Sequence, residues 1–245
     1  MDKIKKILSL SHTTDKLVNT LVVGGSGSGK THCFVVPNIL AGYASYVVYD
    51  TFGDILKETY NVLISKGYEV REYNFEDIEP SSIDMSELSN CLGNKRTAVF
   101  ITHTLFSDSL PREKWFVEKL INLLWLNSRL YEDSKLPVPV EFFFDEYANG
   151  PALPNMSVLM RDCSDTNITF NLIIHSVRQL CALCDKIGGS AEDIARECSM
   201  LLQFGKKEPA TAMDFFFDDP TDISNGDVKV CTNNGDVFVD KAYNW

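Results

Sequence analysis

The stretch LVVGGSGSGKT, residues 21–31, is the part of the sequence that decides the fold. Three apolar residues run directly into a glycine-rich loop that matches the pattern G-x-x-x-x-G-K-[S/T] in full, and a helical stretch follows that ends near Leu40. A strand, this loop and a helix form the phosphate-binding unit known as the P-loop. The predicted loop residues are Gly24, Gly25, Ser26, Gly27, Ser28, Gly29, Lys30 and Thr31.

Each residue type in the loop has a chemical reason. Glycines let the backbone curl so that successive N–H groups point at phosphates, and the following helix adds its positive N-terminal dipole. Lys30 is expected to reach the β- and γ-phosphates, and Thr31 to bind Mg²⁺. A flexible glycine-serine turn is the alternative, but such a turn does not predict Lys30-Thr31 directly after it. We therefore predict that the chain binds ATP, or a similar nucleoside triphosphate, with Mg²⁺.

Short apolar, β-branched runs recur along the chain with helical or loop segments between them. This alternation is typical of a mostly parallel sheet, and uninterrupted apolar runs are typical of strands that helices cover on both faces. We therefore predict an α/β fold with a mostly parallel central sheet flanked by helices. The predicted strands are residues 20–23, 45–49, 68–73, 97–101, 140–144, 170–174 and 200–204.

The C-terminal region predicts a β-hairpin. Residues 228–231 and 237–239 flank a segment whose Asn234-Gly235 pair tolerates the positive φ angles of a tight turn. The 245 residues suit one large α/β domain, because single cores stop growing at roughly 250 to 300 residues. We expect a single nucleotide-binding domain over residues 1–245, with one weak joint at residues 80–89.

A second motif supplies the carboxylates that a P-loop needs. The apolar run 140–144 ends in Asp145-Glu146. Asp145 is expected on the Mg²⁺ side and Glu146 where a general base polarises the attacking water, because adjacent residues at a strand end point in different directions. Acids are common at strand ends, so the pair is informative only together with the P-loop. Asp50 follows another strand and is either a further acid of the same crevice or an ordinary turn residue.

Charge and cysteine content limit the class of protein. The formal net charge of −11 excludes a protein that coats itself with nucleic-acid backbone, so any contact with nucleic acid must be local. Seven cysteines in apolar contexts, without a secretory signal, indicate a reducing compartment. No apolar run reaches the roughly 20 residues of a membrane-spanning helix. We therefore expect this chain to be cytoplasmic.

Together these stretches resemble the TraG/TraD-type coupling ATPases of bacterial conjugation and type IV secretion, which are related to the FtsK and HerA motors. The resemblance covers most of residues 15–205, and DEYAN at 145–149 is much more specific to the family than the P-loop. The matching stretches are 19–31 with 36–38, 45–50 with Gly53, 67–70 with Asn74, 95–100, 136–149, and 173–176 with 179–180.

The resemblance implies a RecA-like P-loop NTPase that hydrolyses ATP at subunit interfaces and drives DNA or a protein–DNA substrate toward a membrane channel. The implied partners are DNA, other type IV secretion components and further copies of the chain in a hexamer, with a monomer as the alternative for this chain alone. The implied location of the full-length parent is the cytoplasmic face of the bacterial inner membrane.

Two departures from the family pattern concern missing segments. Family members usually begin with membrane-spanning helices, and none is found in this sequence. They also carry an all-helical domain between the strands near 68–73 and 97–101, where only residues 74–96 intervene here. Both flanks of the joint, around residues 81–84, still resemble the family, which favours deliberate removal of the insert over natural loss.

A third departure concerns catalysis. The family's interface arginines are replaced by Ser164 and Thr166, and Arg161 and Arg178 are the nearest substitutes. The strand-end glutamine that senses the γ-phosphate is replaced by His175. Because an arginine finger supplies a large part of phosphoryl-transfer catalysis, the alternative to a motor is a nucleotide-binding scaffold with weak or no hydrolysis.

Two other features have simpler interpretations. Cys181 and Cys184 have the spacing of zinc ligands, but a structural zinc site needs four ligands, so we expect them to be small core residues. The apolar segment 112–131 suits a core helix better than a membrane or partner helix. A P-loop ATPase of unrelated function is a third possibility, and the DEYAN segment argues against it.

Overall fold

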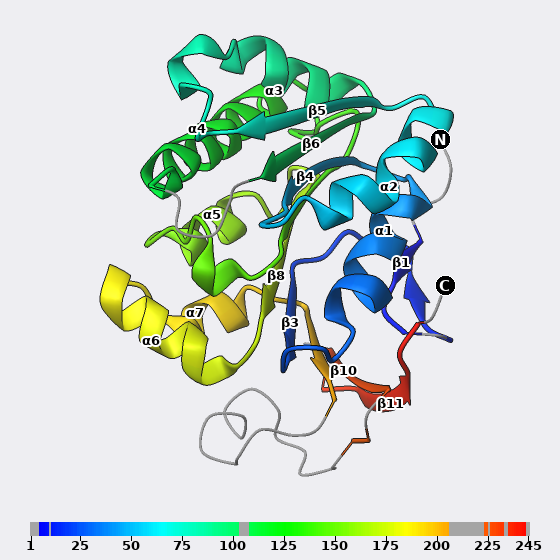
Figure 1. Cartoon of the computed structure of the whole chain (residues 1–245). Coiled ribbons are helices and arrows are strands. Elements are labelled where there is room, and N and C mark those ends of the chain that lie inside the picture. The colour runs from blue at the N-terminus through cyan, green and yellow to red at the C-terminus, as the bar shows by residue number, and fades with distance from the viewer. Residues whose placement is uncertain are drawn as a thin grey trace.

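A nine-stranded sheet forms the centre of the computed structural model, which describes residues 5–9, 11–102, 108–205, 223–224, 226–232 and 235–243 (Figure 1). The strands of this sheet are β3 (Thr20–Gly24), β4 (Ser45–Tyr49), β5 (Glu69–Asn74), β6 (Thr97–Thr102), β7 (Val140–Phe144), β8 (Ile168–Ile174), β9 (Met200–Phe204), β10 (Asp227–Thr232) and β11 (Val237–Lys241). Their order is β11-β10-β9-β3-β8-β7-β4-β6-β5. The seven strands from β9 to β5 are parallel, and β10 and β11 continue the sheet antiparallel at one edge.

The predicted strands agree with this sheet. All seven are present, and their ends lie within two residues of the predicted ones. The predicted C-terminal hairpin is β10–β11, with Cys231 opposite Val237. The turn residues Asn233 and Asn234 lie outside the described part of the chain. The prediction of an α/β fold with a mostly parallel sheet is therefore confirmed.

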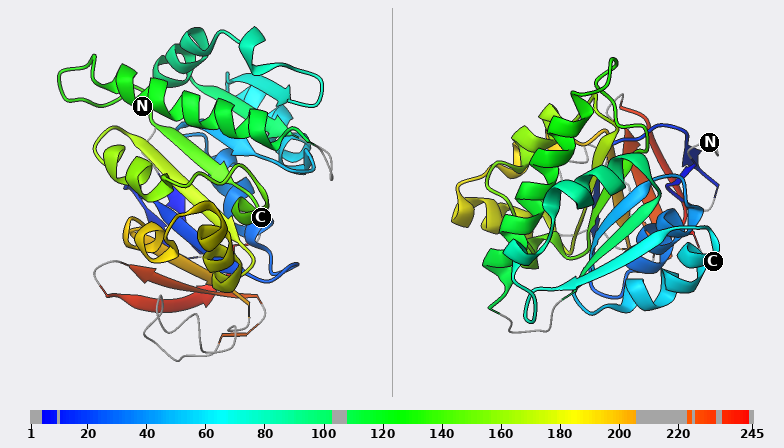
Figure 2. Two further views of the ribbon diagram at one scale, coloured as in Figure 1. Left: turned by 90° about the vertical axis from the view of Figure 1, so that its left-hand side faces the viewer. Right: turned by 90° about the horizontal axis from the view of Figure 1, so that it is seen from above.

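Helices cover both faces of the sheet (Figure 2). Successive side chains of a strand point to opposite faces, so Leu21 and Val23 enter one apolar cluster while Val22 enters the other. One face is covered by α1 (Val36–Ala41) and α2 (Asp54–Ser65), the other by α3 (Met85–Asn94), α4 (Leu110–Ser128), α5 (Met156–Asp162), α6 (Val177–Ile187) and α7 (Ala191–Arg196). Such two-sided cover explains why the strands are apolar at successive positions.

The helix after the P-loop is less regular than the sequence suggests. It begins with a π-helical turn, Thr31–Val35, and continues as α1 to Ala41, one residue past the predicted end near Leu40. Gly42 ends it with φ 76°, a left-handed conformation that suits glycine.

A short N-terminal hairpin, β1 (Lys6–Ile7) with β2 (Thr13–Thr14), was not predicted. Lys6 is fully buried, and its Nζ donates to Val18 O at 2.8 Å and Glu141 Oε1 at 3.2 Å. Tyr43 Oη and Thr169 Oγ1 donate to the same carboxylate. The hairpin is thus attached to β7, the strand that leads to Asp145.

The predicted joint at residues 80–89 is a packed connection. A 3₁₀ turn, η2 (Pro80–Ser82), leads into α3, whose first turn is capped by Asp84 Oδ1 accepting from Glu87 N at 2.9 Å. Leu88 and Leu92 of α3 enter the apolar core with α4. That a further domain is inserted here in relatives stays a prediction.

The segment 112–131 and the cysteines Cys181 and Cys184 were expected to belong to the core. In α4, Phe116, Leu120 and Leu124 are fully buried, as expected for a core helix. Cys184 of α6 lies in the same core, and Cys181 packs against it. Among the helices of the described part of the chain, none is long and apolar enough to cross a bilayer.

Candidate functional site

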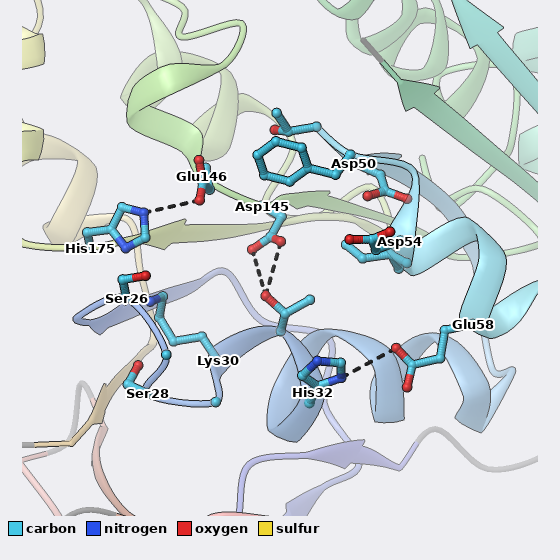
Figure 3. Close-up of a pocket in the computed structure, with 16 residues that line it drawn as sticks. Ser26, Ser28, Lys30, His32, Asp50, Asp54, Glu58, Asp145, Glu146 and His175 are labelled. Carbon is cyan, nitrogen blue, oxygen red and sulfur yellow. Dashed lines mark hydrogen bonds and ion pairs between the residues drawn. The ribbon is translucent and has the colours of Figure 1, made fainter. Parts of the chain in front are cut away.

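The candidate site lies where four neighbouring parallel strands end. In the order β3-β8-β7-β4, the P-loop follows β3, His175 follows β8, Asp145 follows β7 and Asp50 follows β4. Because parallel strands place their carboxyl ends at one edge, residues far apart in sequence meet there. Figure 3 shows Asp145 pointing toward the end of the loop that carries Lys30, Glu146 toward His175, and Glu58 toward His32.

The loop backbone depends on glycine at several positions. Gly27 and Gly29 have φ angles of 73° and 92°, a region that other residues seldom adopt. A Cβ on Gly24 would lie 2.6 Å from Ser28 Oγ and 2.8 Å from Phe204 O. The loop therefore passes too close to the end of β9 for any side chain at Gly24.

Lys30 is buried within its own loop. Its Nζ donates hydrogen bonds to Gly24 O and, at 2.9 Å, to Gly25 O. Burial lowers the pKa of Lys30, whereas the carboxylates of Asp145 and Glu146 raise it. The ammonium group thus lies between the loop carbonyls and the strand-end acids, the position from which a lysine reaches phosphates.

Thr31 and Asp145, the two residues predicted to bind Mg²⁺, are in direct contact. Thr31 Oγ1 donates to Asp145 Oδ2 at 3.1 Å and lies 3.3 Å from Oδ1. A hydroxyl and a carboxylate are the hard oxygen ligands that Mg²⁺ prefers, with water and phosphate oxygens completing its shell. The donor set therefore fits this metal.

Asp145 has a perturbed carboxyl group. Its pKa is raised to about 6, mainly by burial and also by nearby Glu146 and Asp50, against the hydrogen bond from Thr31 and the charge of Lys30, which lower it. Binding of a cation beside such a carboxyl group would favour the loss of its proton.

Glu146 sits at a strained point of the backbone. Its φ of 59° and ψ of 47° are left-handed, which is uncommon for a residue other than glycine. Oε1 lies 3.2 Å from His175 Nε2, and Oε2 accepts from Asn149 Nδ2 at 3.2 Å. That His175 approaches the nucleotide stays a prediction; its Nε2 contacts Glu146, and its Nδ1 is buried without a partner among the described residues.

A cavity of about 280 Å³ lies between the loop and these acids. Of the predicted site residues, Gly24 and Gly25 alone do not line it. Gly25 lines a second hollow of about 360 Å³, together with Phe204, Gly205 and Gly226. Ser26, Gly27, Ser28, Gly29, Lys30, Thr31, Asp145, Glu146 and His175 line the first cavity.

Six further residues line this cavity and were missed: His32, Thr51, Phe52, Asp54, Ile55 and Glu58. Asp54 and Glu58 lie one helical turn apart on α2, and His32 Nδ1 is 3.4 Å from Glu58 Oε2. The i, i+4 spacing of two acids after Asp50 was the signal in the sequence. No arginine lines the cavity in the described part of the chain; Arg161 and Arg178 are exposed on α5 and α6.

The sequence was compared with family models and with curated proteins. Residues 10–85, which include the P-loop, match the family model described as Type IV secretory system Conjugative DNA transfer. No curated protein matches the chain. The family match supports the resemblance to TraG/TraD-type coupling ATPases.

Solved structures share the fold at low sequence identity. The bacterial conjugative coupling protein TrwB, in an unbound form, is 11% identical with a TM-score of 0.62, over 98% of this chain and 89% of that one. The genome packaging NTPase B204 of Sulfolobus turreted icosahedral virus 2, solved with AMP, is 14% identical with a TM-score of 0.56, over 92% and 98%. EccC of Thermomonospora curvata (ATPases 2 and 3) is 12% identical with a TM-score of 0.56, over 99% and 41%. The chain therefore has the RecA-like P-loop NTPase fold.

Proposed function

We propose that this chain, which resembles the coupling ATPases of type IV secretion, is a motor domain that binds and hydrolyses ATP to drive transfer of DNA or a protein–DNA substrate. The observation that carries the proposal is the contact of Thr31 Oγ1 with Asp145 at 3.1 Å beside Lys30 and Glu146. A P-loop, a metal-side acid and a second acid in one cavity are the parts that phosphoryl transfer to water needs.

The proposed cofactors are ATP and Mg²⁺. TrwB has been solved in complex with ADP and Mg²⁺ and with the ATP analogue ADPNP, at 11% identity and TM-scores of 0.58 and 0.59. In this chain Thr31 Oγ1 and an Asp145 oxygen would hold the metal. Bound Mg²⁺ would neutralise charge on the phosphates during transfer.

The proposed mechanism assigns a task to each side chain. The loop N–H groups orient the phosphates, and Lys30 Nζ moves from the carbonyls of Gly24 and Gly25 to the phosphate oxygens. With Thr31, the Asp145 carboxylate would hold the metal. Glu146, whose oxygens keep free lone pairs beyond their two hydrogen bonds, accepts a proton from the attacking water.

DNA, other secretion components and further copies of the chain are the proposed partners. The net charge of −11 requires that contact with DNA be confined to a local surface. Since no arginine lines the cavity in the described ranges, the isolated chain is expected to turn over slowly, and a basic side chain from a neighbouring copy to accelerate it.

Two variants test the proposal. Lys30→Ala removes the cation that meets the phosphates and is expected to abolish detectable ATP binding and hydrolysis. Glu146→Gln is expected to keep binding but to lower kcat by about 10² to 10⁴, the usual contribution of a general base. Lys57→Ala, on the exposed surface of α2, is the matched lysine control. A kcat of Glu146→Gln equal to that of wild type would remove Glu146 from the mechanism.

A nucleotide-binding scaffold without hydrolysis is the second candidate function. It is favoured by the cavity's acidic lining and by the exposed positions of Arg161 and Arg178 away from it. This candidate predicts tight ATP binding, no phosphate release at high protein concentration with DNA, and a monomer in light scattering. Phosphate release that is lost in Lys30→Ala would exclude it.

A further inference from the structure

A closed ring of hydrogen bonds lies at the rim of the cavity, around Glu146. Asn149 Nδ2 donates to Glu146 Oε2 at 3.2 Å, and Gln179 Nε2 donates to Asn149 Oδ1 at 3.3 Å. His175 N donates to Gln179 Oε1 at 3.3 Å, and His175 Nε2 returns to Glu146 Oε1 at 3.2 Å. Both oxygens of Glu146 and both ends of each amide are therefore engaged.

The ring fixes the orientation of its members. An ionised carboxylate only accepts hydrogen bonds, so Glu146 requires a proton on His175 Nε2 and the NH₂ group of Asn149. That choice turns Asn149 Oδ1 toward Gln179 and leaves Gln179 Oε1 for the backbone of His175. Reversing either amide would set like groups against each other at two places.

Three elements are joined by the ring. Glu146 and Asn149 belong to the turn after β7, His175 follows β8, and Gln179 lies in the first turn of α6. Ser176 Oγ caps α6 by accepting from Gln179 N at 3.0 Å, which holds the backbone of Gln179 in place. The ring therefore bridges the ends of two adjacent strands across the mouth of the site.

The strained backbone of Glu146 explains why such support is needed. A left-handed glutamate persists only where its surroundings hold it. Asn149 does so twice, because its backbone N–H also donates to Glu146 O at 2.8 Å. The Glu146 side chain is 28% exposed, so without the ring it would be free to rotate into solvent.

We propose that Asn149 and Gln179 are positioning residues for Glu146: they hold its carboxylate, through His175 and directly, at the position from which it accepts a proton. The proposal rests on the proposed hydrolytic function. It assigns the two amides to the catalytic step and not to nucleotide binding, since neither lines the cavity.

The test is a double-mutant cycle of Asn149→Ala, Gln179→Ala and the double variant. Each single change is expected to lower kcat about ten- to a hundredfold, as small misplacements of a catalytic group do. The dissociation constant of a ribose-labelled fluorescent ATP analogue is expected to change less than about twofold. Because removing either amide already opens the ring, the kcat of the double variant is expected to be no lower than that of the more impaired single variant. Asn90→Ala, an exposed amide on α3 that bonds Asn94, is the control.

A readout without turnover separates this inference from the proposed function. The ¹⁵N shifts of the His175 ring, assigned by comparison with His175→Gln, are expected to report a protonated Nε2 and to change in both alanine variants. If the wild-type protein shows no ATP turnover, the proposed hydrolytic function is wrong. If the ¹⁵N shifts of the His175 imidazole do not change in the alanine variants, the closed ring of hydrogen bonds is wrong. Three outcomes would overturn the positioning role in a wild-type protein that turns over. The first is an unaltered kcat in Asn149→Ala and Gln179→Ala, and the second is a double variant whose loss in kcat is the product of the two single losses. The third is a loss of affinity for the ATP analogue as large as the loss in kcat.

Discussion

At the scale of single residues, Gly24 is a position where close packing excludes a side chain. Gly24→Ala would place Cβ 2.8 Å from the backbone oxygen of Phe204, which cannot move without disturbing β9. We expect a loss of about 1 to 3 kcal/mol in the free energy of unfolding, the usual cost of overpacking. Urea unfolding measures it.

Gly25→Ala is the matched control for Gly24→Ala. A Cβ at Gly25 would meet nothing within 4 Å, and its φ does not require glycine. This variant is expected to stay within about 0.5 kcal/mol of wild type, as surface changes usually do. Equal losses in both variants would show that the approach to β9 is not the cause.

Asp145 gives the molecule a pH-dependent stability. Its pKa of about 6 lies above the ordinary value, so the folded state binds this proton more tightly than the unfolded state. Its contribution is therefore most favourable below about pH 4 and is lost as the pH rises through 6. Without Mg²⁺ and nucleotide, Asp145→Asn is expected to be more stable than wild type at pH 7.5 by roughly 2 to 3 kcal/mol and nearly equal at pH 4.

Urea unfolding at pH 4, 5, 6 and 7.5 measures the difference for Asp145→Asn. Asp54→Asn, an acid with a 76% exposed side chain on the same cavity, is the control and is expected to show little difference between the two ends of the range. A stability gain of Asp145→Asn that is the same at every pH would contradict the assignment to this carboxyl group.

At the scale of elements, the buried Lys6–Glu141 pair attaches the N-terminal hairpin to β7. Both side chains are fully buried, and burial lowers the pKa of Lys6 against the attraction of Glu141. Lys6→Met leaves the buried Glu141 carboxylate without its cation, with only the hydroxyls of Tyr43 and Thr169 as partners, and a loss of about 3 to 5 kcal/mol is expected in urea unfolding. The double variant Lys6→Met/Glu141→Gln is expected to recover much of it, because no buried charge then remains.

The exposed pair Lys57–Asp54 is the control for Lys6–Glu141. Its side chains are 73% and 76% exposed, and removing either charge is expected to change the free energy of unfolding by at most about 0.5 kcal/mol. A double variant at Lys6 and Glu141 that is no more stable than Lys6→Met would indicate that shape, and not charge, holds the hairpin.

At the scale of the whole molecule, a ligand bound at the edge of the sheet stabilises the folded state, because the unfolded chain does not bind it. At about 100 times the dissociation constant, MgATP adds about 2.7 kcal/mol. For a chain of this size, each kcal/mol raises Tm by about 2 to 4 °C, so a rise of roughly 5 to 10 °C is expected in calorimetry. Lys30→Ala is expected to show no rise, and EDTA to reduce that of wild type. A rise in Lys30→Ala equal to wild type would place the ligand elsewhere.

The sequence by itself determined the P-loop, the seven parallel strands and the terminal hairpin. These features are local: the loop needs glycines at fixed offsets, as Gly27 and Gly29 show, and a buried strand needs a short apolar run. The same locality placed Asp145 and Glu146 at the end of β7, and the pattern of strands sufficed for the fold class.

Only the tertiary structure decided which of these side chains meet. The order β3-β8-β7-β4 brings Thr31 to Asp145, 114 positions away, and the packing of the separate β1–β2 hairpin brings Lys6 to Glu141, 135 positions away. It also brings His175 Nε2 to 3.2 Å from Glu146 Oε1, a contact that the sequence did not predict. The physical reason is that hydrogen bonds and ion pairs act over a few ångströms in space, whereas a pattern in the sequence records only neighbours along the chain.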